Sequence, residues 1–238
     1  MRAEEFLIER WTKKTVSDYY DHKKDLKFTN KDVRVSQPFD GCVVLRYRTV
    51  PDAARSFFRV AEYYDGKHYG SGVRQVSLPE FLDNWMDRQG NVDYFKFWDG
   101  FNIPDHAFRS WLKSARPLSN AEQVMVNAVR KNTQGQKKFC VIGVGSDDPD
   151  TIRHEMFHAR YYLDSAFKTA VDGLIKLHKN HSDFKTIQRV LIKKLDYVNH
   201  VDEETAAYLY AGSQLKLVFG VDAKDLVKTF RELDKNES

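Results

Sequence analysis

The chain has 238 residues, of which 42% are hydrophobic and 13% aromatic, a composition that can bury a core and does not indicate a disordered chain. Its 38 basic and 34 acidic residues leave a formal net charge of +4, too small by itself to indicate nucleic acid or an acidic membrane as a partner. No apolar run reaches the roughly 18 residues of a membrane-spanning helix, and the acidic N-terminal stretch is not a secretory signal.

Residues 1–135 are predicted to form an N-terminal mixed α/β region, in which short apolar runs alternate with turns. The segment 55–66 fits a helix or a strand, and its pattern does not decide between them. Ser119 and Glu122 have the spacing of a capping box at a helix start. The other elements expected here are a strand at 42–48, a capped helix from 77, a strand from 93 that runs into a Gly/Asn/Pro turn, a short helix after that turn, a helix over 118–131 and a turn at 132–136.

Residues 136–238 are predicted to form a mostly helical region. A short strand at 137–145 ends at Gly145. Asp148 and Pro149 have the order of an N-cap followed by proline at the first helical position. The apolar pattern then predicts one helix from 149 into the 170s and further helices over 184–198, 202–220 and 222–233. The expected fold class is α+β, with residues 1–135 either a separate domain or part of the same one.

The chemistry of the chain is concentrated in HEMFH, residues 154–158. Residues four apart on a helix lie about 40° apart around its axis, so His154 and His158 project from one face. Two imidazoles at this spacing can hold one cation. Glu155 projects beside them, where a carboxylate can act as general base toward a water. The alternative is a solvent-facing pair of histidines on an amphipathic helix.

HEMFH on a helix that follows a strand resembles the zincin metallopeptidases, over roughly residues 137–215. The resemblance implies that His154 and His158 bind Zn²⁺ and that Glu155 is catalytic. It also implies that the strand 138–144 could hold an extended peptide substrate by β-addition, as edge strands do in zincins; the alternative is an ordinary buried strand.

A zinc site that keeps one position for water needs a third protein ligand. Asp164 stands where the metzincin pattern has its last ligand, but Tyr161 replaces the glycine at which the metzincin helix turns back. SprT-like proteases, which have a similar HEM..HA helix, use a later histidine, although the sequence around 178–183 does not match their pattern well. The downstream histidines are His178, His181 and His200.

Glu204 is favoured as the third ligand. It lies one predicted helical hairpin after His158, which returns the chain to the site, and Ala207 shares its helix face and permits close packing. The segment also resembles the third-ligand helix of gluzincins, with Thr205 where they have alanine. Glu203 is the alternative ligand; it and Asp202 are otherwise candidates to accept a hydrogen bond from a ligand histidine.

The predicted function is a zinc-dependent peptidase acting on peptides or proteins, with zinc held by His154, His158 and Glu204 and with Glu155 as general base. The alternative is a non-catalytic zincin-fold protein that binds a protein partner or, through its basic and aromatic N-terminal segment, a nucleic acid. Candidates for a second donor to the developing oxyanion are Tyr161, Tyr162, Tyr208, Tyr210 and His200.

Two cysteines, Cys42 and Cys140, stand far apart in the sequence and form no CxxC pair. They predict no disulfide framework, so a reducing, cytoplasmic location is the simpler expectation. No membrane partner is expected.

Overall fold

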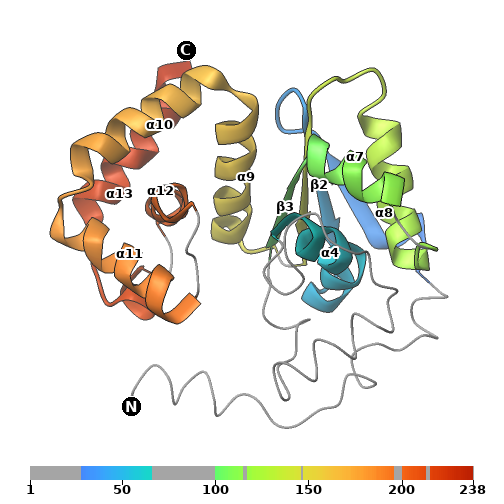
Figure 1. Ribbon diagram of the computed structural model, residues 1–238, viewed down its shortest axis with the longest axis horizontal. Helices are drawn as coiled ribbons and strands as arrows, with labels where there is room; N and C mark the ends of the chain where they lie inside the picture. Colours follow the sequence, from blue (N-terminus) through green and yellow to red (C-terminus); the bar gives the residue numbers. More distant parts are fainter. Residues whose placement is uncertain are drawn as a thin grey trace, which may run out of the picture. The chain divides into compact units, whose positions relative to one another are not determined.

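The computed structural model describes residues 28–65, 100–114, 117–145, 147–195, 200–212 and 215–237 (Figure 1). It has the expected α+β fold, mostly helical with one small mixed sheet. The described chain divides between Asp147 and Asp148 into two compact units. The first unit extends past the predicted boundary at 135 because the strand over 140–144 pairs with strands of the first unit.

The first unit is a four-stranded sheet with helices on one face. The strands run in the order β1-β2-β4-β3: β1 pairs antiparallel with β2, β2 parallel with β4, and β4 antiparallel with β3. Alternate residues of β2, among them Val43 and Leu45, join the same buried core as the helices. The strands are β1 (Val33–Ser36), β2 (Cys42–Tyr47), β3 (Gly100–Pro104) and β4 (Cys140–Val144), preceded by a 3-10 turn at Asn30–Asp32; the helices are α4 (Val50–Asp65), α7 (Asp105–Ser114) and α8 (Asn120–Asn132).

The segment whose pattern fitted either a helix or a strand is helix α4. Ala54, Phe57, Phe58 and Ala61 are all buried, and this spacing places them on one helical face toward the sheet. The helix begins before residue 55 because the Thr49 hydroxyl accepts a hydrogen bond from the backbone N–H of Asp52. The predicted strand at 42–48 and the capping box of α8 are confirmed.

One expectation about the strands is wrong, and for a second strand the structure excludes one of two alternatives in favour of an ordinary buried strand. Gly100–Pro104 is strand β3, not a turn, because Phe101 and Ile103 point into the core while the backbone pairs with β4. The strand over 138–144 is not an edge strand: β4 has β2 on one side and β3 on the other, so it has no free edge for an extended peptide. The short helix expected after the turn is α7. The helix predicted from 77 and the start of the strand predicted from 93 lie outside the described residues.

Gly143 in β4 is expected to be essential for packing. A Cβ atom at this position would lie 2.3 Å from Cε2 of the buried Phe57 ring. Gly143→Ala should therefore lower the free energy of unfolding by about 1–3 kcal/mol, measured by urea denaturation. Gly173→Ala is the matched control, because nothing lies within 4 Å of a Cβ there and the position is helical; it should raise stability by about 0.5–1 kcal/mol. Equal stabilities of the two variants would contradict the packing argument.

A buried ion pair joins α4 to α8. Arg59 donates from Nε to Oε1 of Glu122 over 2.6 Å, and its Nη2 contacts the second carboxylate oxygen. The two side chains are 5% and 0% exposed. The backbone N–H of Ser119 also donates to Glu122, so one carboxylate both caps α8 and fixes α4 against it.

Cys42 and Cys140 are neighbours across the parallel β2–β4 pair, although they are far apart in the sequence. Both are buried and form no disulfide, and the Cys140 thiol donates to Oδ1 of Asn102 over 3.0 Å. Burial raises the pKa of the Cys42 thiol to about 12, so this side chain stays protonated at neutral pH.

The second unit is a bundle of helices around α12, which packs on α9, α11 and α13 (Figure 1). Large apolar side chains, including Phe157, Phe184 and Phe230, form its core. None of the described helices is both long and apolar enough to cross a membrane. The elements are α9 (Pro149–Leu163), α10 (Ser165–His178), α11 (Ser182–Leu195), α12 (Val201–Ala211), a π-helical turn at Leu215–Phe219, α13 (Lys224–Arg231) and a 3-10 turn at Glu232–Glu237.

The start of α9 is confirmed: Asp148 is the N-cap and Pro149 the first helical residue. The prediction of one helix into the 170s is wrong, because Asp164 adopts an extended conformation that ends α9 and its carboxylate caps α10. The prediction of a single helix over 202–220 is also wrong. Gly212, at φ 75°, ends α12 in the left-handed region that glycine adopts without strain.

Candidate metal centre

Helix α9 presents His154 and His158 one turn apart on the same face. Their Nε2 atoms are 3.2 Å from each other and the ring centroids are 4.9 Å apart. The two imidazole side chains are 16% and 13% exposed, so they are sheltered but still reachable from solvent. The i, i+4 spacing in the sequence therefore becomes a pair of converging nitrogen atoms.

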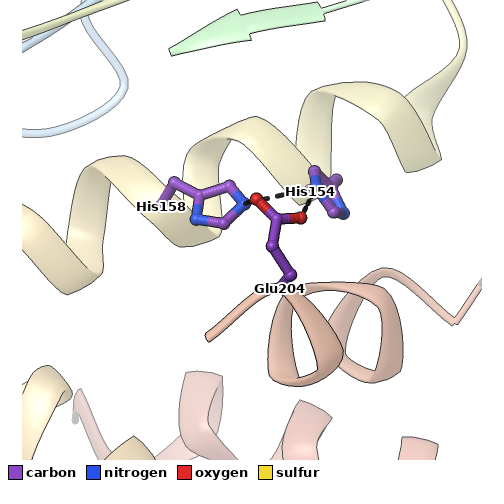
Figure 2. A group of neighbouring side chains, drawn as sticks. All are labelled: His154, His158 and Glu204. Atoms are coloured by element: carbon purple, nitrogen blue, oxygen red, sulfur yellow. Dashed lines mark hydrogen bonds and ion pairs between the residues drawn. The ribbon is translucent and has the colours of Figure 1, made fainter. Parts of the chain in front are cut away.

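Helix α12 brings Glu204 to this pair. Its start follows His200, whose backbone at φ 62° is left-handed and whose carbonyl accepts the N–H of Glu204. Figure 2 shows the Glu204 carboxylate reaching from α12 between the two imidazole rings of α9. Oε2 lies 3.5 Å from Nε2 of His154, and Oε1 lies 3.5 Å from Nε2 of His158.

These distances fit a cation held by the three side chains. In a tetrahedral zinc site with bonds of about 2.0–2.1 Å, ligand atoms are about 3.4 Å apart, close to the 3.2 and 3.5 Å separations observed here. Oε2 of Glu204 is moreover buried and makes no hydrogen bond within the described part of the chain. A buried carboxylate oxygen of this kind is costly unless a cation or donor satisfies it.

Glu203 orients one of the two histidines. Its Oε1 lies 2.8 Å from Nδ1 of His158. Because a carboxylate only accepts hydrogen bonds, Nδ1 carries the proton, which leaves Nε2 as the atom that faces Glu204. Glu203 and Glu204, consecutive residues of α12, thus face opposite nitrogens of the His158 ring. Glu203 accepts the hydrogen bond of a candidate ligand histidine, which is the role that the sequence analysis gave as its alternative to binding the metal.

The electrostatics of the site reflect this close packing of opposite charges. Burial alone would raise the pKa of the Glu204 carboxyl, but His158 and His154 hold that pKa well below its ordinary value. Burial opposes the charged form of His158, yet Glu204 and Glu203 outweigh it and raise the pKa of the imidazole well above its ordinary value. The site is therefore strongly favourable to positive charge beside Glu204.

Small and aromatic side chains set the distance between the two helices. Ala206 and Ala207 of α12 are fully buried, which lets its backbone approach neighbouring helices closely. The Tyr208 ring packs edge-on against the His154 ring, with centroids 4.6 Å apart. The ring centroids of Tyr210 and Phe157 of α9 are 5.3 Å apart. Together these contacts hold the first turn of α12 opposite His154 and His158.

Two arginines anchor the other end of α12. Arg153, the residue before the first histidine, donates to the carbonyl of Ala211 over 3.3 Å, and Arg231 of α13 donates to the same carbonyl and to that of Tyr210. Cations at a helix C-terminus also complement its dipole. The sequence does not predict these contacts, because both arginines lie far from Ala211 in the chain and no short motif indicates the pairing.

The remaining catalytic candidates are placed as follows. Glu155 is half-buried on α9, directly after His154, and is not one of the three converging side chains. The Tyr161 hydroxyl donates to Asp172, and the Tyr210 hydroxyl donates to Asp234, so both are engaged in structural hydrogen bonds. Tyr208 is the candidate whose ring contacts a site histidine. Tyr162 is half-buried on α9, and His200 is exposed immediately before α12.

The alternative ligands are used elsewhere. Asp164 caps α10 by accepting the N–H groups of Ala166 and Phe167. His178 packs near the Phe230 ring, and the exposed His181 accepts the N–H of Asp183. Within the described ranges, the set His154, His158 and Glu204 is the one group whose ligand atoms could share a metal ion, all lying within 4.8 Å of one another.

Comparisons with known proteins add no assignment: no protein-family model matches the chain, and neither the curated proteins nor the solved structures contain a match.

Proposed function

We propose that this chain is a zinc-dependent metallopeptidase of the zincin type, acting on peptides or proteins in the cytoplasm. The observation that supports the proposal is the convergence of His154, His158 and Glu204 from two helices at distances suited to a tetrahedral cation. The oxygen-and-nitrogen donor set fits zinc. Two buried cysteines that form no disulfide fit a reducing location.

In the proposed reaction, His154, His158 and Glu204 hold the zinc ion, with Glu203 fixing the ring of His158. A bound zinc ion supplies Lewis-acid chemistry and makes water reactive at neutral pH. Glu155 accepts a proton from the attacking water and then donates it to the leaving amine as the peptide bond breaks. The chain's own contribution is thus three converging side chains and the carboxylate of Glu155, which follows His154 on α9.

Metal content tests the site directly. Purified wild-type protein should contain one zinc ion per chain by elemental analysis, and His154→Ala and Glu204→Ala should lose it, because three protein ligands are needed to hold the ion. His181→Ala is the matched control and should retain zinc, since His181 lies outside the ligand group. A Glu204→Ala protein that kept its zinc would show that another residue is the third ligand. A wild-type protein that contains no zinc and takes none up when zinc is added would refute the site.

A measurement of peptide hydrolysis distinguishes the proposed peptidase from the non-catalytic alternative. Zinc bound as described, with no hydrolysis across a broad peptide library, would favour a zincin-fold protein that binds a protein partner or a nucleic acid. The basic and aromatic N-terminal segment invoked for nucleic acid lies mostly outside the described residues, so salt-dependent DNA and RNA binding is the measurement that decides between those two partners.

A further inference from the structure

A groove of about 630 Å³ opens on the first unit between α7, α8 and the turn that leads into β4. Figure 1 shows α7 and α8 beside each other next to the sheet. The groove belongs to the first unit, whereas the candidate metal centre lies in the second. No step of the proposed peptidase reaction uses the groove. Its lining residues are Phe108, Arg109, Leu112, Val129, Arg130, Thr133, Gly135, Gln136, Lys137 and Phe139.

The base of the groove is apolar. Phe108 and Phe139 are buried and pack edge to face with centroids 6.1 Å apart, beside the buried Val129. Leu112 is only partly buried against this core. A groove with a preformed apolar base and a partly exposed leucine suits the insertion of an apolar side chain.

The residues that line the groove carry net positive charge, although Asp105 lies 3.4 Å from Nε of Arg109 and Asp40 accepts a hydrogen bond from Nε2 of Gln136 over 3.3 Å. Three of the ten lining residues are basic and none is acidic. Arg109 is held in place by donating to the carbonyl of Gln136 over 2.9 Å and by lying 4.9 Å from the Phe139 ring centroid. Arg130 and Lys137 are exposed and make no ion pair within the described ranges. Because Asp105 already pairs with Arg109, the preference of the groove for an anionic ligand rests on Arg130 and Lys137.

One polar atom at the groove further limits which chemical groups a ligand there should carry. Oε1 of Gln136 is buried and accepts no hydrogen bond within the part of the chain that the structure describes. An unsatisfied buried acceptor calls for an N–H or O–H donor. A ligand that combines carboxylates, an apolar side chain and N–H donors is a peptide, whereas a simple anion or an acyl chain lacks at least one of these groups.

We propose that this groove binds an acidic peptide segment of a partner protein, with an apolar side chain over Leu112 and flanking carboxylates on Arg130 and Lys137. The site is independent of zinc binding and hydrolysis. If the chain is a peptidase, the groove is a second point of contact for protein partners that carry such a segment.

Fluorescence polarisation of short labelled peptides tests the proposal. The probes are a pooled set with aspartate and glutamate around a central leucine, a set with lysine in the flanking positions and a set with serine in place of the leucine. The acidic leucine set should bind, and rising salt should weaken it. The lysine set should not bind, and the serine set should bind at least about tenfold more weakly.

Charge reversal locates the binding site. Arg130→Glu with Lys137→Glu should weaken binding of the acidic leucine set at least about tenfold. Lys176→Glu with Lys179→Glu, which makes the same net-charge change at exposed positions of the second unit, should alter it less than about twofold. If the first variant does not fold, judged by circular dichroism, Arg130→Gln with Lys137→Gln replaces it with the same expected direction.

Three outcomes would overturn the proposal. The first is no preference for acidic over lysine-flanked peptides, and the second is equal loss of binding in the two charge-reversal variants. The third is tighter binding of a short oligonucleotide than of any acidic peptide, with that binding lost in the Arg130 and Lys137 variant, which would assign the groove to nucleic acid instead. Zinc removal should leave peptide binding unchanged, so failure here is distinguishable from failure of the metal site.

Discussion

Glu155→Gln should lower peptide hydrolysis by about 100- to 10,000-fold while the protein keeps its zinc. The amide side chain has nearly the same size as the carboxylate but cannot accept the proton of the attacking water at neutral pH. Glu155 follows His154 on α9 and is not one of the three converging side chains, so the metal should remain bound. The measurement is kcat/KM on a peptide substrate found by library screening, together with zinc content.

The matched control is Glu232→Gln, an exposed position after α13, which should retain wild-type activity and zinc. Full activity in Glu155→Gln would show that another group takes the proton and would make the proposed mechanism wrong. Loss of zinc in that variant would instead make Glu155 part of the metal site.

The largest expected loss of stability follows from Arg59→Met in the first unit. The substitution keeps an unbranched side chain of similar length but removes the guanidinium from Glu122, whose carboxylate is fully buried. Removing one partner of a buried ion pair typically costs about 3–5 kcal/mol, because the other charge stays buried without it. Urea denaturation should show a lowered midpoint at an unchanged slope.

Arg34→Met supplies the comparison for an exposed pair. Arg34 and Asp147 are 73% and 74% exposed and 3.4 Å apart, so this variant should change the free energy of unfolding by no more than about 0.5 kcal/mol. Similar losses in the two variants would contradict the claim that burial makes the Arg59–Glu122 pair important.

Local signals in the sequence were enough to predict how His154, His158 and Glu204 converge in the candidate metal centre. The cap at Asp148–Pro149 and the i, i+4 spacing of the histidines depend on neighbouring residues and the helical repeat alone. The break at 178–183 predicted a hairpin that returns the chain toward α9, which is how Glu204 was identified. That the three side chains bind zinc stays a prediction.

Features that depend on distant parts of the chain were missed or wrongly predicted. The position of β4 inside the sheet depends on its pairing with β2 and β3, which no pattern within 138–144 encodes. The break at Asp164 was hidden because apolar residues such as Phe167 continue at helical spacing across it, although an aspartate N-cap marks the start of α10. The anchors of α12 by Arg153 and Arg231 are likewise non-local.

The arrangement of the ligands on either side of a hairpin has a consequence for folding. His158 lies on α9 and Glu204 lies in the first turn of α12, and α10 and α11 form most of the chain between these two residues. An ion that binds both residues would act as a reversible cross-link between the two helices. Its effect on stability would be similar to that of a disulfide, although the two cysteines of this chain form no disulfide. For a loop of this size, chain-entropy arguments give a stabilisation of roughly 4 kcal/mol. The metal would then hold the helical unit closed as well as serve its chemistry.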